Sequence, residues 1–121
     1  MAPIEEEQLE SLVHRYTEAA KAHGQATENG DYEKANEAHD VIASAYRELR
    51  RRGLDAQRAL LALLDHSDPG VRSWSAAHAL EFSPAEGERV LSRMENIPKS
   101  LVSFSAKMTL RQWREGKLRF P

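Results

Sequence analysis

The stretch from Leu60 to Leu80, LLALLDHSDPGVRSWSAAHAL, decides the fold. Its leucines and alanines recur at helical spacings on either side of an Asp-Pro-Gly turn, which predicts two short amphipathic helices in close succession. Asp68 can accept a hydrogen bond from the first turn of the second helix. Pro69 then stands at the first helical position, where no backbone N–H is needed. The stretch therefore predicts a helical pair joined by a tight turn.

Similar signals divide the rest of the chain into further helices. Asn29-Gly30 is a turn signal, Asp31 is a predicted N-cap, and Gly53 follows a run of arginines as a predicted helix end. Ser83, Pro84 and Glu86 combine a cap, a first-position proline and a capping-box glutamate. Six helices are expected, over about 5–28, over 32–52, from 56, from 69, from 84 to near 98, and over about 100–115. No segment shows the alternation typical of a strand.

The short links and matched helix lengths predict an all-α fold, a short HEAT/armadillo-like α–α superhelix of about six helices in three pairs. Residues 1–121 are expected to form a single domain, with a longer N-terminal hairpin over 1–53 and two shorter pairs over 54–121. Two or three pairs are near the minimum that lets a solenoid bury a core. A chain of 121 residues can bury roughly two-thirds of its unfolded surface, so it needs no metal or disulfide for stability.

Composition excludes several classes of site. The chain has no cysteine, which removes disulfides, zinc–thiolate centres and thiol nucleophiles. His39-Asp40 and the loop Asp65-His66-Ser67-Asp68 suggest metal or hydrolase chemistry, but no second ligand cluster, His-Glu-x-x-His or Gly-x-Ser-x-Gly accompanies them. We therefore expect no catalytic activity, no metal and no cofactor. No apolar run approaches the roughly 20 residues of a membrane span, and a cytoplasmic location is expected.

Three segments, 63–66, 71–78 and 104–116, resemble a small bacterial HEAT-like family of unknown function. The resemblance is good over about 55–118 and looser over the N-terminal hairpin. It implies a single-domain cytosolic protein with the helical-repeat fold. Some members are similar to immunity proteins that neutralise polymorphic toxins, so the resemblance also implies protein binding. It carries over no catalytic residue.

Charge is distributed unevenly along the chain. Residues 1–46 carry ten acidic and three basic side chains, whereas residues 47–121 carry nine acidic and fourteen basic ones. Helical geometry places several of the first group on the exposed side of the hairpin, and three of them line up on the second helix with no basic residue between them. This face is predicted to bind a basic protein, such as a nuclease toxin, through Glu7, Glu18, Glu33, Glu37 and Asp40. The chain itself is expected to be a monomer or a weak homo-oligomer.

Alternatives remain open for each charged or aromatic cluster. The acidic face is also typical of a simply solvated surface, and acids near a helix N-terminus are favourable in any case. A nucleic-acid interface is the second functional interpretation, although the isoelectric point near 6.2 argues against it. It would use Arg50, Arg51 and Arg52 with Arg111 and Arg114. The aromatic set Trp74, His78, Phe82 and Trp113 fits either a partner anchor or, more often in a small domain, the core.

Overall fold

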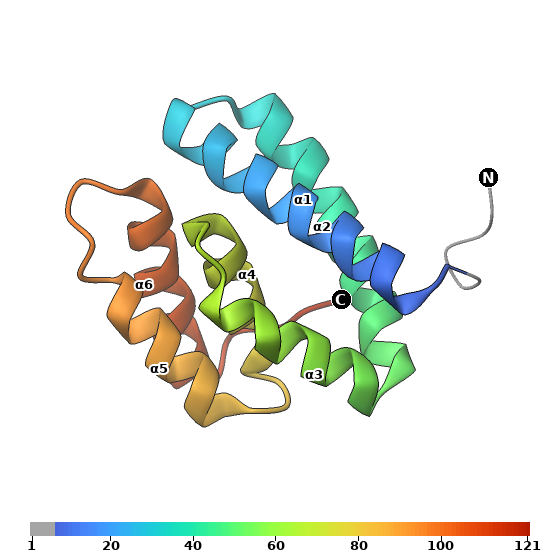
Figure 1. The fold of residues 1–121 in the computed structure, drawn as a ribbon. Coiled ribbons are helices and arrows are strands. Elements are labelled where there is room, and N and C mark those ends of the chain that lie inside the picture. Colours follow the sequence, from blue (N-terminus) through green and yellow to red (C-terminus); the bar gives the residue numbers. More distant parts are fainter. Residues whose placement is uncertain (1–6) are drawn as a thin grey trace.

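A computed structural model describes residues 7–121 (Figure 1), and among these residues six α-helices and no strand occur. The helices are α1 (Leu9–Asn29), α2 (Tyr32–Arg52), α3 (Leu54–Ala62), α4 (Pro69–Ala79), α5 (Pro84–Met94) and α6 (Leu101–Arg114), with a 3₁₀ turn at Leu63–Asp65 after α3. The all-α prediction and the expected number of helices are confirmed for this part of the chain. None of these helices is long and apolar enough to cross a membrane.

Helix α1, rather than α2, faces the C-terminal helices, and α3 continues from the end of α2 (Figure 1). The antiparallel hairpin α1–α2 lies along one side, α4 packs against α1, and α5 and α6 follow on the far side of α4. The segment after α6 then returns towards the end of α2, where the Arg50 guanidinium donates to the main-chain oxygen of Phe120. This arrangement is consistent with the expected helical superhelix.

Several helix boundaries differ from the prediction. The first helix was expected from Glu5, but positions 5 and 6 lie outside the described residues, and the helix begins at Leu9 after an extended Gln8. The fifth helix ends at Met94 instead of near Pro98. Lys99, with a φ of 58°, adopts the left-handed conformation in the turn that leads into α6. The predicted continuation to Pro98 was therefore wrong.

N-caps explain why most of the other predicted starts are correct. Asp31 Oδ1 accepts from the Lys34 N–H at 3.2 Å, and Asp68 Oδ1 accepts from the Val71 N–H at 3.1 Å. Ser83 precedes Pro84 as expected, but its side chain accepts no capping hydrogen bond. The expected capping box at α5 is therefore wrong in its chemistry, while the start of the helix is correct. Among the signals predicted for α5, the proline at the first helical position is the one that fits the observed start of the helix.

Two apolar clusters form the core. The first lies between the hairpin and the helices α3 and α4, and the second joins α4, α5 and α6. Along α6, Val102 and Leu110 are buried, whereas Leu101 and Phe104 are 52% and 61% exposed. Of the predicted aromatic set, His78 is buried. The other three, Trp74, Phe82 and Trp113, are partly buried against the two clusters, which supports the core interpretation.

Helices α1 and α4 approach each other closely at two glycines. A Cβ atom added to Gly70 would lie only 2.7 Å from the carbonyl oxygen of Ala20 and 3.2 Å from the Cα of Gly24. The two backbones are therefore in direct contact, which no residue with a side chain would allow without displacement. This contact fixes how the hairpin sits on the rest of the chain.

Candidate functional site

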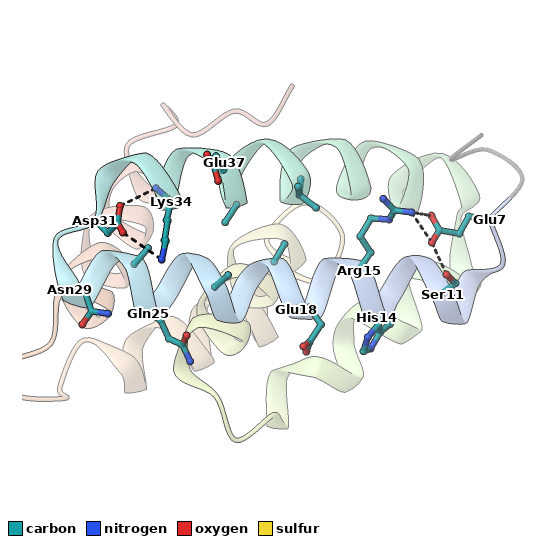
Figure 2. A pocket seen from close by; sticks show the side chains of 15 residues that line it. Glu7, Ser11, His14, Arg15, Glu18, Gln25, Asn29, Asp31, Lys34 and Glu37 are labelled. Carbon is teal, nitrogen blue, oxygen red and sulfur yellow. Dashed lines mark hydrogen bonds and ion pairs between the residues drawn. The ribbon is translucent and has the colours of Figure 1, made fainter. Parts of the chain in front are cut away.

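An open groove of about 880 Å³ runs between α1 and α2 (Figure 2). All the residues that line it lie between positions 7 and 41, so it occupies the side of the hairpin away from α3 to α6. Its apolar lining consists of small side chains: Ala19, Ala22, Ala26, Ala38 and Val41. A long groove between two helices with a small apolar floor has the shape that accepts an amphipathic helix.

Charged side chains from both helices border this groove, as ion pairs towards its ends and as carboxylates between them (Figure 2). An ion pair lies towards each end: Arg15 Nη2 is 3.1 Å from Glu7 Oε1, and Lys34 Nζ is 4.0 Å from Asp31 Oδ2. Between these pairs, Glu18 projects from α1 and Glu37 from α2. The groove thus combines an apolar floor with carboxylates along both helices.

The two middle carboxylates differ in their present partners. Glu18 lies 3.1 Å from the Lys21 ammonium, an exposed pair that contributes little to stability. Glu37 makes no ion pair within residues 7–121. Both carboxylates are therefore accessible to a cation from outside the chain.

Three of the five predicted partner-binding residues line the groove, namely Glu7, Glu18 and Glu37. The other two, Glu33 and Asp40, are exposed on α2 but lie outside it. Glu33, Glu37 and Asp40 nevertheless form one row along α2. Of this row only Glu37 lines the groove, beside Lys34, Ala38 and Val41 of the same helix.

The structure adds two features to the predicted acidic face. The absence of an intervening base was predicted only for the row of three acids on the second helix, and the groove beside that row is also lined by Arg15 and Lys34. Glu7 was predicted to bind a partner, and within the chain it accepts a hydrogen bond from Ser11 Oγ at 2.6 Å and pairs with Arg15. These contacts, the hydrogen bond from Ser11 first, lower the pKa of Glu7. Glu7 therefore anchors the segment that leads into α1.

The arginines of the nucleic-acid alternative are engaged within the chain. Arg51 Nη2 and Arg52 Nε lie 2.6 and 2.7 Å from the same oxygen of Glu48, whose side chain is only 6% exposed. Their hydrogen bonds lower the pKa of Glu48 to about 2. Arg50 donates to Glu81 Oε1 at 3.3 Å. These contacts provide a structural reason for the three arginines.

The C-terminal arginines of that alternative lie on α6. Arg111 Nε is 3.6 Å from Glu115 Oε2, an exposed pair one helical turn apart. Arg114 is exposed in the last turn of the same helix, where positive charge suits the negative helix end. Nucleic-acid binding by these arginines stays a prediction.

A buried histidine joins four separate parts of the chain. The Tyr16 hydroxyl lies 2.6 Å from His78 Nδ1, and the ring of Tyr46 stacks on the His78 ring at 3.6 Å with an angle of 6°. The ring of Phe120 packs edge-on at 4.6 Å. Tyr46 also donates a hydrogen bond to the carboxylate of Glu81. Sequence reasoning missed this cluster because its members are far apart along the chain.

The protonation states within this cluster follow from burial. Burial, with smaller effects of Arg50 and His39, lowers the pKa of His78 to about 3. Burial raises the pKa of the Tyr16 hydroxyl well above its usual range, so Tyr16 donates and His78 Nδ1 accepts. His78 is only 2% exposed, which fits a structural role better than contact with a substrate. No group of three or more His, Asp or Glu within residues 7–121 is arranged to hold a metal ion.

Comparison with known proteins identifies the family. A family described as "Domain of unknown function (DUF2019)" matches residues 10–113. The chain belongs to this family. The DUF2019 assignment confirms the predicted membership in a family of unknown function, while the resemblance to immunity proteins has no counterpart in it.

A solved structure shows the same fold. The crystal structure of the protein RPA1889 from Rhodopseudomonas palustris CGA009 superimposes with a TM-score of 0.83 at 20% sequence identity, covering 98% of each chain. At this identity, the similarity supports the fold alone. A search of functionally curated proteins gave no match.

Proposed function

We propose that this DUF2019 chain is a non-catalytic protein-binding module whose α1–α2 groove receives a helix of a basic partner. One observation carries the proposal: Glu18 and Glu37 project from the two helices on either side of an alanine floor, in a groove of about 880 Å³. A helix is the partner element that this shape fits, because it can present an apolar stripe with charged residues on both flanks.

The floor and the borders of the groove would contribute differently to binding. Alanines let a partner backbone approach closely, and packed helices lie about 8–10 Å apart. The apolar stripe of the partner helix would cover Ala19, Ala22 and Ala38. Lysine or arginine side chains on its flanks would reach Glu18 and Glu37 and form charge-assisted hydrogen bonds, the stronger class of hydrogen bond.

Charge outside the groove would act mainly on the rate of association. Glu33 and Asp40 are exposed beside the groove and belong to an N-terminal region with an excess of acidic side chains. Complementary fields accelerate encounter and lose this effect as the salt concentration rises. We therefore assign these two carboxylates to attraction of the partner and the two middle carboxylates to direct contact.

The finer proposal is an immunity-type or adaptor role in the cytoplasm, with a nuclease toxin as the partner. A nuclease binds phosphates through basic residues, so its active surface has the charge that this groove would attract. Occupation of that surface would block nucleic acid from entering. The charge of the hairpin and the sequence resemblance support this identity of the partner.

Charge reversal tests the proposal once a partner has been captured with the tagged protein and purified. Changing Glu18→Lys together with Glu37→Lys is expected to weaken binding at least tenfold, or about 1.4 kcal/mol, by isothermal titration calorimetry. The matched control is Glu86→Lys with Glu95→Lys, which changes the net charge equally at exposed positions of α5 and its end. An equal loss in both pairs, or no loss in either, would contradict a role of the groove.

A further inference from the structure

A second cavity lies where α1, α4, α6 and the C-terminal segment meet. Its volume is about 190 Å³, and it shares no residue with the α1–α2 groove. Gly24 and Gly70 contribute backbone to its wall at the close contact between α1 and α4. The remaining lining residues are His23, Thr27, Ser73, Trp74, Ala77, Val102, Ser105, Thr109, Leu118 and Phe120.

The lining indicates the charge of a possible ligand. None of these residues is an aspartate, glutamate, lysine or arginine. A charged ligand would lose its hydration here without gaining an opposite charge, which is costly. Trp74 and Phe120 instead provide aromatic surfaces for a ring, and Val102 and Leu118 add aliphatic ones. The lining therefore favours an uncharged and largely apolar molecule.

Hydroxyl groups supply the polar part of the cavity. Those of Ser73, Ser105 and Thr109 make no hydrogen bond within the described part of the chain, although helical serines and threonines often bond to their own backbone. Thr17 of α1 does so, donating to the carbonyl oxygen of Val13 at 2.8 Å. Ser73 and Thr109 are half-buried and Ser105 is exposed at the cavity lining, so all three hydroxyls can donate to or accept from a ligand.

His23 has a defined tautomer in this cavity. Trp74 Nε1 donates to His23 Nδ1 at 3.2 Å, and an indole N–H can only donate. Burial, with a smaller effect of His39, lowers the pKa of His23 and favours the neutral ring. The single proton of the neutral ring must then reside on Nε2, which makes His23 a hydrogen-bond donor.

We propose that this cavity binds a small uncharged ring compound that carries one polar substituent, such as a hydroxyl or carbonyl group. Its size supports this class, because an apolar cavity of about 150 Å³ is known to hold benzene. A volume of about 190 Å³ therefore suits one ring with a short substituent. The apolar walls would hold the ring, while the hydroxyls and His23 would bind the substituent.

The C-terminal segment is part of this site. Leu118 and Phe120 line the cavity, and Arg50 of α2 donates to the Phe120 main-chain oxygen at 3.3 Å. The cavity therefore depends on the attachment of this segment to α2.

Three probes of one size test the proposal on the whole chain: benzyl alcohol, benzoate and benzylamine. Binding is measured by ¹H–¹⁵N NMR titration, which follows the indole N–H of Trp74. We expect benzyl alcohol to bind with a dissociation constant below about 1 mM, as suits a very small ligand. Benzoate and benzylamine are expected to bind at least tenfold more weakly.

Two variants place a larger side chain at the cavity lining and locate the binding: Ser73→Leu from a half-buried position of α4, and Ser105→Phe from an exposed position of α6. At least one of them, shown to be folded by circular dichroism, is expected to weaken benzyl alcohol binding tenfold or more. The exposed variant Gln112→Phe on α6 is the matched control and should bind as the parent does. Equal binding of charged and neutral probes, full binding in both filled variants, or no binding at 5 mM would overturn the proposal.

Discussion

Replacing His78 with glutamine is expected to remove most of the pH dependence of stability between pH 7 and pH 5. In the folded chain the pKa of His78 is lowered to about 3, mainly by burial, whereas an unfolded histidine titrates near 6.5. The unfolded state therefore takes up a proton below pH 6.5 and the folded state does not. The contribution of neutral His78 to the stability of the fold is therefore fully present above pH 6.5 and is lost as the pH falls towards 3.

The size of this effect follows from proton linkage. Each unit by which the pH falls in that window lowers the free energy of unfolding by up to about 1.4 kcal/mol. The parent should therefore lose about 2 kcal/mol of stability between pH 7 and pH 5. Carboxylates contribute little in this range, because they titrate mainly below it. His23 adds a smaller slope in the same direction, since its pKa is also lowered.

Urea unfolding at pH 7, 6 and 5 measures this slope. Glutamine at position 78 retains a side-chain acceptor for the Tyr16 hydroxyl, so the variant should remain folded, although less stable at pH 7. His14→Gln is the control, because His14 is exposed on α1. A slope that persists in the His78 variant and disappears in the His14 variant would refute the assignment.

Gly70→Ala is expected to destabilise the protein by about 1–3 kcal/mol, the usual cost of forcing extra atoms into a packed contact. The new methyl group would lie 2.7 Å from the Ala20 carbonyl oxygen, and because that atom is backbone, α1 and α4 must separate. Gly24→Ala should cost less, since its Cβ atom would lie 3.0 Å from the Gly70 Cα.

The sign of this effect makes the test decisive. In an uncrowded helix, a change from glycine to alanine stabilises by about 0.5–1 kcal/mol. Thermal and urea unfolding at pH 7 distinguish the two outcomes directly. A Gly70→Ala variant that is as stable as the parent, or more so, would show that the two helices do not meet as described.

Features that depend on neighbouring residues could be predicted from the sequence. The side chains of Asp31 and Asp68 each reach a backbone N–H only three residues ahead, so the local sequence was sufficient to place these two helix starts. Ser83 shows the limit of such reasoning, because a favourable residue at the N-cap need not form the hydrogen bond.

Features that depend on packing between distant segments could not be predicted. His78 meets Tyr16, Tyr46 and Phe120 across 62, 32 and 42 positions of the chain, and no local spacing indicates such a cluster. Likewise, the contact between Gly24 and Gly70 depends on which helices pack together. The second cavity requires all these placements at once.

The groove shows both kinds of feature. Helical periodicity was sufficient to predict that Glu18 and Glu37 are exposed on the hairpin. It could not reveal that the two carboxylates border one groove or that Arg15 and Lys34 also line it, because these relations depend on the register between α1 and α2. Rows of acids along one helix therefore predict exposure better than they predict a binding surface.

Photo-crosslinking from the groove floor tests the central claim most directly. A photoreactive residue at Ala22, exposed between the two helices, is compared in host lysate with the same residue at Gln112 on α6. We expect the photoreactive residue at Ala22 to give one dominant protein adduct. Excess unlabelled parent protein should suppress this adduct, whereas unlabelled protein that carries Glu18→Lys and Glu37→Lys should not. An adduct that forms equally from Gln112, or that the unlabelled charge-reversed protein suppresses as well as the parent does, would contradict this claim.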